Sequence, residues 1–354
     1  MIKPLTSLRF LFAFMVFLTH MSFLISENNP FFKELYYRFF YEGYIGVGFF
    51  FMLSGFILSY TYRDSLLSEK VSKRVFYIKR LARLYPLHLI TFLISIPVLL
   101  MEVGFDIPLF TVQNLTNIFL LQSFGIDRTY FFSGNALSWS ISDEQFFYLL
   151  FPFLIIAFHL FKNYARIVLG VASIVIVYML WQVKGGVEEH TFFYINPFTR
   201  LVDFTLGVFL YDVYLFFKSK PIAKQATVLE IGSVVLLAVF IYFNADIPQA
   251  ARYSCYYWLP IFFLIFSFSF QSGVLSKLLS KNWMVVLGEI SFSFYMFHQL
   301  VIRYYTRLNV DFFQINNLYV SMLIVFVFSL LISYGSYYLI EKPATSYIVK
   351  KIKK

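Results

Sequence analysis

The chain has 354 residues, of which 60% are hydrophobic, 22% aromatic and only 14% charged. Soluble domains average about 45–50% apolar and about 25% charged residues, so this composition excludes an ordinary soluble domain and a disordered chain. The net charge of +10 would point to nucleic acid in a soluble protein, but here the distribution of basic residues between loops explains it better. We therefore expect no nucleic-acid partner. The single cysteine, Cys255, excludes a disulfide framework.

Long apolar stretches recur along the whole chain. A helix needs about 20 mostly apolar residues to cross a bilayer. Ten stretches meet that description, at residues 5–25, 43–61, 85–101, 139–161, 167–183, 197–217, 227–243, 253–271, 283–305 and 318–340. Two shorter, interrupted stretches, Phe31–Phe40 and Leu115–Phe124, are typical of interfacial or re-entrant pieces. The pattern predicts an all-α polytopic membrane protein with about ten transmembrane helices, formed by one integral-membrane domain over residues 1–354.

The basic residues predict the orientation of these spans. With the N-terminus in the cytosol, twenty of the 29 Lys and Arg residues fall in cytosolic segments, seven fall on the opposite side, and Arg9 and Arg200 lie inside spans. Loops on the cytoplasmic side carry the excess of Lys and Arg. We therefore expect both termini in the cytosol, with the short basic tail at 342–354 lying on anionic lipid headgroups.

Ionisable residues within the spans are costly and are functional candidates by default. A rise of about 1.5 Å per residue puts Arg9 about 6 Å from the cytosolic boundary and His20 about 22 Å into the membrane. The same rise puts Glu144 about 7 Å below the outer boundary, near the level of His20. Two layers are therefore predicted, a cytosolic layer of Arg9, Arg80 and Arg83 and an outer-half layer of His20, Glu144, Arg200, Asp203 and His298.

The chemistry of the two layers differs. The outer layer contains groups that can act as general acids and bases, whereas guanidinium groups bind phosphates with bidentate geometry. This arrangement predicts a phosphorylated donor at the cytosolic side whose far end reacts deeper in the membrane.

Structural alternatives remain open for the same residues. Arg80 and Arg83 could anchor the cytosolic end of a helix, and Arg9 could extend to the headgroups. His20 and His298 could be hydrogen-bonded between helices, and Asp203 could simply pair with Arg200. Small residues in the second span, namely Gly46, Gly48, Ser54 and Gly55, could serve close helix approach.

Seven short motifs follow one another from the first predicted span to the last. They are Leu5–Phe10 with the Arg-x10-His spacing to His20, Gly46–Phe56, Arg80–Pro86 with Arg-x-x-Arg, Leu137–Pro152 with Trp139 and Glu144, Arg200–Phe204, Leu287–His298 and Ile340–Pro343. Each motif alone is weak, but in this order they resemble membrane-bound acyltransferase family 3. Members of that family acylate surface polysaccharides and related carbohydrates.

The resemblance implies an O-acyltransferase in a bacterial-type inner (cytoplasmic) membrane. It would transfer an acyl group, acetyl by preference, from cytosolic acetyl-CoA or another acyl-CoA to a hydroxyl of a surface or lipid-linked carbohydrate. His20 is then expected to act as general base or transient acyl carrier, assisted by Glu144. The remaining predicted roles are acyl-CoA binding by Arg9, Arg80 and Arg83 and support of the acceptor side by Arg200, Asp203, His298, Trp139 and Ser54. No metal is expected.

The sequence departs from the family at three positions. Gly48 and Gln145 stand where many members carry acidic residues, and Asp203 stands where glutamate is common. The Arg-x10-His and Arg-x-x-Arg spacings are kept, so we expect these differences to affect which acceptor is preferred rather than whether an acyl group is transferred. The esterase-like domain appended to some members is absent, so we expect transfer to be completed within the membrane domain or with a separate partner.

Two other functions compete with acyl transfer. A proton-coupled transporter or flippase for a glycan-type substrate would also need buried histidines and carboxylates, but it leaves the Arg-x-x-Arg spacing unexplained. A non-catalytic membrane assembly component is favoured only if the outer-half polar residues are dispensable.

Overall fold

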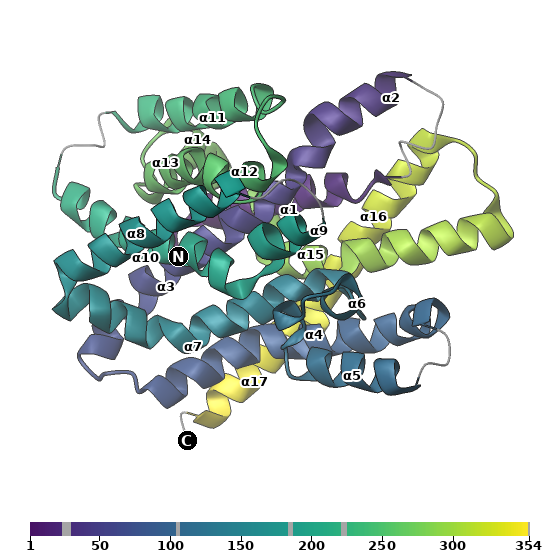
Figure 1. Cartoon of the computed structure of the whole chain (residues 1–354), viewed down its shortest axis with the longest axis horizontal. Coiled ribbons are helices and arrows are strands. Elements are labelled where there is room, and N and C mark those ends of the chain that lie inside the picture. Colours follow the sequence, from purple (N-terminus) through teal and green to yellow (C-terminus); the bar gives the residue numbers. More distant parts are fainter. Residues whose placement is uncertain (23–29, 104–106, 183–186, 221–224, 353–354) are drawn as a thin grey trace. The chain divides into compact units, whose positions relative to one another are not determined.

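The computed structural model of the chain describes residues 1–22, 30–103, 107–182, 187–220 and 225–352. Within these ranges all regular secondary structure is helical and no strand occurs (Figure 1). The prediction of an all-α protein is confirmed for the described residues.

The chain divides into two compact units, each assembled from several stretches of sequence. Unit 1 comprises Met1–Arg9, Ile45–Tyr77 and Asp143–Gly288, and unit 2 comprises Phe10–Tyr44, Ile78–Ser142 and Glu289–Lys354. Four helices contribute residues to both units, namely α1 (Lys3–Thr19), α4 (Lys73–Val103), α7 (Trp139–Leu160) and α15 (Asn282–Leu308). The single domain expected over residues 1–354 stays a prediction.

Unit 1 is organised around the close packing of two helices, α3 (Ile45–Leu67) and α10 (Pro197–Lys218). A side chain at Gly55 would collide with the backbone carbonyl of Phe204, and one at Gly207 would collide with that of Met52. Glycines therefore allow the two backbones to touch. The expectation that small residues serve close approach is confirmed at Gly55.

Unit 1 also contains α8 (Lys162–Gln182), α9 (Val187–His190), α11 (Ala226–Tyr242), α12 (Gln249–Tyr253), α13 (Trp258–Ser269) and α14 (Val274–Leu279). Figure 1 shows α11, α13 and α14 side by side. The fully buried carboxylate of Glu230 on α11 accepts hydrogen bonds from the backbone N–H groups of Gly273 and Ser276, each at 3.0 Å. Glu230 thereby binds two backbone N–H groups at the start of α14 that have no partner within the helix. Gly273, the residue before α14, has no side chain that could do so.

Unit 2 contains α2 (Pro30–Leu35), α5 (Ile107–Ile118), α6 (Arg128–Phe131), α16 (Leu318–Ser336) and α17 (Lys342–Ile352), besides most of α1, α4 and α15. The ring of Phe17 on α1 packs 5.5 Å from Phe294 on α15 and 5.8 Å from Phe326 on α16. Aromatic side chains therefore hold these three helices together.

An irregular segment joins α5 to α7 in unit 2. Buried polar groups hold it in place: Asn117, near the end of α5, donates to the hydroxyl of Ser133 at 2.7 Å, and the side chain of Gln122 donates to the backbone carbonyl of Ser138 at 2.9 Å. Non-helical backbone is tolerated at membrane depth only where protein buries it. The predicted re-entrant piece Leu115–Phe124 comprises the end of α5 and the start of this segment.

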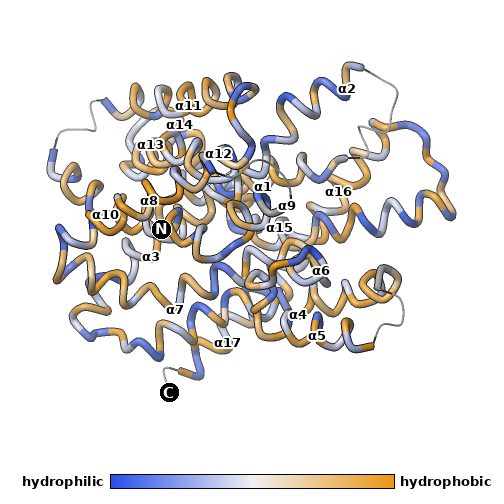
Figure 2. Tube along the Cα trace, in the orientation of Figure 1, coloured by the Kyte–Doolittle hydropathy of each residue, from blue (hydrophilic) through white to orange (hydrophobic). Residues whose placement is uncertain are grey.

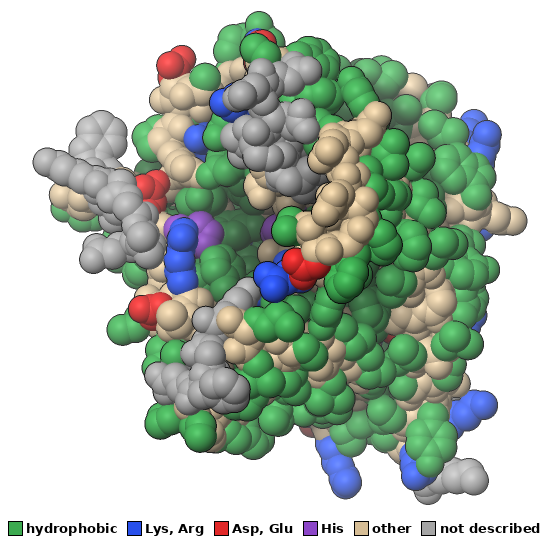
Figure 3. Space-filling view, turned by 90° about the vertical axis from the view of Figure 1, so that its right-hand side faces the viewer, with side chains coloured by type: hydrophobic (Ala, Val, Ile, Leu, Met, Phe, Trp, Pro, Cys, Tyr) green, Lys and Arg blue, Asp and Glu red, His purple; other side chains and the backbone are tan. Residues whose placement is uncertain are grey.

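Each of the ten predicted spans overlaps a helix, but the boundaries differ. Six helical stretches have the length and composition to cross a membrane: Pro30–Leu67, Lys73–Met101, Ala136–Leu160, Lys162–Leu180, Asn282–Phe313 and Leu318–Ile352. Figure 2 shows apolar residues along most of their length, and Figure 3 shows one face covered largely by hydrophobic side chains. These stretches support an integral membrane protein, whereas the count of ten and the cytosolic termini stay predictions.

Two helices differ most from the predicted spans in where they begin or end. Helix α4 begins at Lys73 rather than at residue 85, because Lys, Arg, Leu and Ala favour helix even where the chain is too polar to count as a span. Helix α1 ends at Thr19 rather than at residue 25. His20 therefore follows the last helical residue instead of lying inside the helix, and the rest of that predicted span partly lies outside the described residues.

Candidate active site

Two histidines from distant parts of the sequence meet in unit 2. His20 follows the end of α1 and is half-buried, whereas His298 lies within α15 and is fully buried. The Nε2 atom of His298 lies 3.3 Å from the Nδ1 atom of His20. The Nδ1 atom of His20 is also 2.8 Å from the carbonyl oxygen of Val16, and that of His298 is 3.0 Å from the carbonyl oxygen of Phe294.

Aromatic rings surround His298. Phe17 and Phe294 lie 5.9 Å and 5.8 Å from its ring, and Tyr295 lies 6.0 Å away. The hydroxyl of Tyr295 is 2.8 Å from that of Ser140 at the start of α7. Tyr295 was given no role from the sequence, although its position three residues before His298 places both on neighbouring positions of one helix face.

Trp139 is the first residue of α7 and is 2% exposed. The turn before it is fastened to α15, because the side chain of Asn135 donates to the carbonyl of Met296 at 2.9 Å. The motif that contains Trp139 and the motif that contains His298 therefore meet within unit 2.

Glu144 lies in unit 1, in the second turn of α7, and is half-buried. Its Oε1 atom accepts hydrogen bonds from the hydroxyl of Ser54 at 3.0 Å and from that of Tyr148 at 2.7 Å. Ser54 is therefore more than a small packing residue, since it binds a candidate catalytic carboxylate. Tyr148 was missed as a candidate, although its spacing of four residues from Glu144 predicts that the two side chains meet on a helix.

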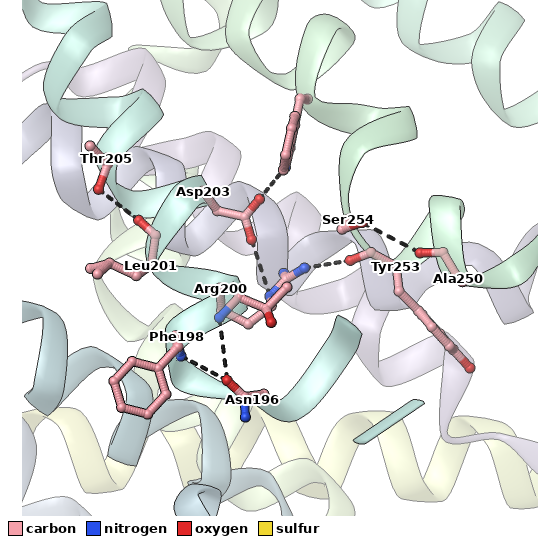
Figure 4. A network of polar contacts seen from close by, with 11 residues as sticks. Asn196, Phe198, Arg200, Leu201, Asp203, Thr205, Ala250, Tyr253 and Ser254 are labelled. Carbon is pink, nitrogen blue, oxygen red and sulfur yellow. Dashed lines mark hydrogen bonds and ion pairs between the residues drawn. The ribbon is translucent and has the colours of Figure 1, made fainter. Parts of the chain in front are cut away.

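Arg200 and Asp203 form a buried ion pair in unit 1, with Nε and Oδ2 3.1 Å apart and exposures of 1% and 2% (Figure 4). The guanidinium group also donates to the carbonyl of Tyr253, and Asp203 accepts from the indole N–H of Trp258. The ring of Phe51 lies 5.2 Å from the Arg200 guanidinium carbon. The pairing considered as a structural alternative for Asp203 is therefore present, and it ties α10 to the segment around α12 and α13.

The cationic candidates are half-buried residues of two helices. Arg9 lies on α1 in unit 1, and Arg80 and Arg83 lie on α4 in unit 2. Three residues apart on a helix, Arg80 and Arg83 share one side of α4. The hydroxyl of Thr345 donates to the carbonyl of Ala82, between the two arginines, at 3.0 Å, so α17 is fastened to this turn.

Each unit thus brings part of the predicted site together. Unit 2 joins His20 to His298 and to the turn that carries Trp139. Unit 1 holds the two remaining clusters, which are Ser54 with Glu144 and Arg200 with Asp203. The meeting of His20 with Glu144, and of Arg9 with Arg80 and Arg83, stays a prediction.

These clusters lie on motifs that one family model covers in a single match. The model of acyltransferase family 3, described as an acyltransferase domain, matches residues 3–338. The chain belongs to acyltransferase family 3. The family predicted from the seven motifs is therefore confirmed.

Several curated members and relatives are similar to this chain. Acyltransferase MdmB of Streptomyces mycarofaciens is 28% identical over 289 residues, which cover 75% of this chain and 70% of MdmB. A putative O-acetyltransferase of Staphylococcus aureus strain COL is 29% identical over 303 residues, which cover 76% of this chain and 48% of the relative. O-acetyltransferase OatA of Staphylococcus aureus strain NCTC 8325 is 27% identical over 282 residues, or 73% and 46% of the two chains.

The chain spans about half the length of these staphylococcal relatives. No solved structure matches the chain.

Proposed function

We propose that this protein is an O-acyltransferase that moves an acyl group, acetyl by preference, from cytosolic acyl-CoA to a hydroxyl of a surface or lipid-linked carbohydrate. We place it in the inner (cytoplasmic) membrane. The match to acyltransferase family 3 over residues 3–338 carries the proposal, and the names of the staphylococcal relatives support acetyl transfer to oxygen.

The donor would bind through Arg9, Arg80 and Arg83. Planar guanidinium groups pair with phosphate oxygens through two parallel hydrogen bonds, and coenzyme A presents several phosphates. The position of Arg80 and Arg83 on one side of α4 supports a shared anion, and the hydrogen bond from Thr345 steadies the backbone between them.

His20 would carry the chemistry. As general base it takes the proton of the acceptor hydroxyl while that oxygen attacks the thioester carbonyl, and the C–S bond then breaks to release coenzyme A. In the second form of the mechanism His20 carries the acyl group transiently before the acceptor takes it. Glu144, held by Ser54 and Tyr148, balances the charge of the imidazolium or relays its proton.

The acceptor side would be supported by residues on α10, α15 and the turn before α7. Arg200 and Asp203 order the backbone around α12 and α13, and Trp139 is fastened against α15 through Asn135. This support is positional, because the charges of the ion pair are already matched.

Mass analysis of surface glycans tests the proposed function. A strain that lacks the gene should lose an acyl ester from one glycan and regain it when the gene is restored. If acylation is unchanged and the amount of exported glycan falls instead, the transporter or flippase function is correct and acyl transfer is not.

A further inference from the structure

The hydrogen bonds around His20 and His298 determine which ring nitrogens carry protons. A backbone carbonyl only accepts hydrogen bonds, so a ring nitrogen that bonds to it must be an N–H donor. His20 Nδ1 lies 2.8 Å from the carbonyl of Val16, and His298 Nδ1 lies 3.0 Å from that of Phe294. Both rings therefore carry hydrogen on Nδ1.

The second nitrogen of a neutral imidazole is an acceptor. His298 Nε2 is thus a lone-pair acceptor, and the atom 3.3 Å from it is the protonated Nδ1 of His20. The Nδ1–H group of His20 is shared between Val16 and His298. Nε2 of His20 is left with the lone pair, which is the atom that a general base needs.

We propose that His298 is the positioning residue of His20, in the place that a carboxylate occupies in Asp–His pairs. The proposal rests on the proposed function. It assigns Nε2 of His20 as the base and Nδ1–H as the group held by His298. Because Nδ1 is already engaged, Glu144 is left to act on charge or proton transfer rather than on ring orientation.

The proton balance of the step follows from this assignment. The acceptor oxygen bonds to the acyl carbon, its proton moves to Nε2 of His20, and the C–S bond breaks. The imidazolium then shares its charge with His298, because its Nδ1–H bonds more strongly to the neutral Nε2 acceptor. Nε2 of His20 finally returns its proton to the coenzyme A thiolate, and the pair is neutral again.

The surroundings of His298 explain why the partner is an imidazole. His298 is fully buried against the rings of Phe17 and Phe294. An ionised carboxylate buried there would carry a large desolvation cost, whereas a neutral imidazole offers the same acceptor without a permanent charge.

The tautomers can be observed without any activity assay. The chain has five histidines, so ring ¹⁵N spectra of the ¹⁵N-histidine-labelled protein in lipid bilayers can be assigned with His20→Gln and His298→Gln. We expect both His20 and His298 to carry hydrogen on Nδ1 and none on Nε2 near neutral pH. A His20 ring protonated on Nε2 alone would overturn the proposal.

Kinetics of two matched variants test the role in transfer. The amide of Gln reaches the place of a histidine Nε2 and can accept from His20, whereas that of Asn reaches only the place of Nδ1. With acetyl-CoA and de-esterified surface polysaccharide from a strain lacking the gene, His298→Asn should lower kcat by about 10- to 100-fold with little change in either KM. His298→Gln should recover most of that loss.

His88→Gln is the control, because His88 is equally buried in unit 2 and its Nε2 lies 2.9 Å from a backbone carbonyl, that of Asn117. It should retain the wild-type kcat. Equal losses in His298→Gln and His298→Asn would reduce His298 to a packing residue. If the wild-type protein transfers no acetyl group, the proposed function fails, while the ¹⁵N spectra still decide the geometry of the pair.

Discussion

Single side chains divide the proposed reaction into two separable tasks. The guanidinium groups of Arg80 and Arg83 would bind the donor, and the imidazole of His20 with the carboxylate of Glu144 would move the proton. A substitution that preserves charge or shape while removing one property can therefore assign each task to a residue.

Arg83→Lys should weaken binding of acetyl-CoA by about tenfold or more, equivalent to about 1.4 kcal/mol. Lysine keeps the positive charge, but it cannot reproduce the two parallel hydrogen bonds of a guanidinium group to a phosphate. Calorimetry on the purified protein measures the affinity. Arg307→Lys is the control, because that side chain is 72% exposed and pairs with Asp311. Unchanged affinity in Arg83→Lys and in Arg80→Ala/Arg83→Ala would make these residues topology anchors only.

Glu144→Gln should slow acyl transfer by about 10- to 100-fold, a smaller loss than that caused by His20→Gln. The amide oxygen of Gln can still accept from Ser54 and Tyr148, so the variant removes charge but keeps the local geometry. Tyr148→Phe, which keeps the charge and removes one hydrogen bond, should be affected less. A Glu144→Gln rate as low as that of His20→Gln would show that the carboxylate itself transfers the proton.

At the scale of helices, the contact between α3 and α10 positions both Glu144's partner Ser54 and the Arg200–Asp203 pair. Gly55→Ala should destabilise unit 1 by about 1–3 kcal/mol, because the added methyl group meets the carbonyl of Phe204. Thermal unfolding in detergent measures the loss. Gly232→Ala, with no neighbouring atom within 4 Å, should be neutral or slightly stabilising. Equal melting temperatures for the two variants would contradict this close packing.

Hydropathy predicted where helices lie better than where they begin. The apolar part of α4 was placed correctly, but five of its first twelve residues are Lys or Arg, so that part did not count as a span. The break at Ser254, after α12, falls at the second residue of the predicted span 253–271, because Tyr253 and the residues that follow Ser254 are aromatic or apolar and hydropathy does not detect a helix break. The length of an apolar stretch indicates which residues lie in lipid. The residues at which a helix begins and ends depend instead on local helix propensity and on tertiary contacts.

The sequence indicates which residues are candidates for the site better than it indicates what they contact. The motifs identified His20, Glu144 and His298 as candidates, because ionisable groups within apolar spans are energetically costly and are therefore functional candidates. Their contact partners could not be predicted from the sequence, because Ser54 and Glu144 are separated by 90 residues and His20 and His298 by 278. Only partners at helical spacing, such as Tyr148, could have been found from the sequence.

At the scale of the whole molecule, the distribution of Lys and Arg predicts the direction in which every span runs. Reporter fusions after Lys354 and within residues 63–80 should report the cytosol, and fusions within 184–196 should report the outer side. A C-terminus on the outer side would reverse the depths of all candidate residues and place Arg80 and Arg83 away from cytosolic acyl-CoA.

The most direct test of the proposed reaction is the rate of acetyl transfer by purified, folded His20→Gln protein, measured beside the wild type with acetyl-CoA and de-esterified surface polysaccharide. Losing general acid–base catalysis costs about 10²–10⁴ in rate, so the variant should bind acetyl-CoA normally and transfer at or below about a hundredth of the wild-type rate. Retention of more than about a tenth of the wild-type rate would contradict a chemical role for His20.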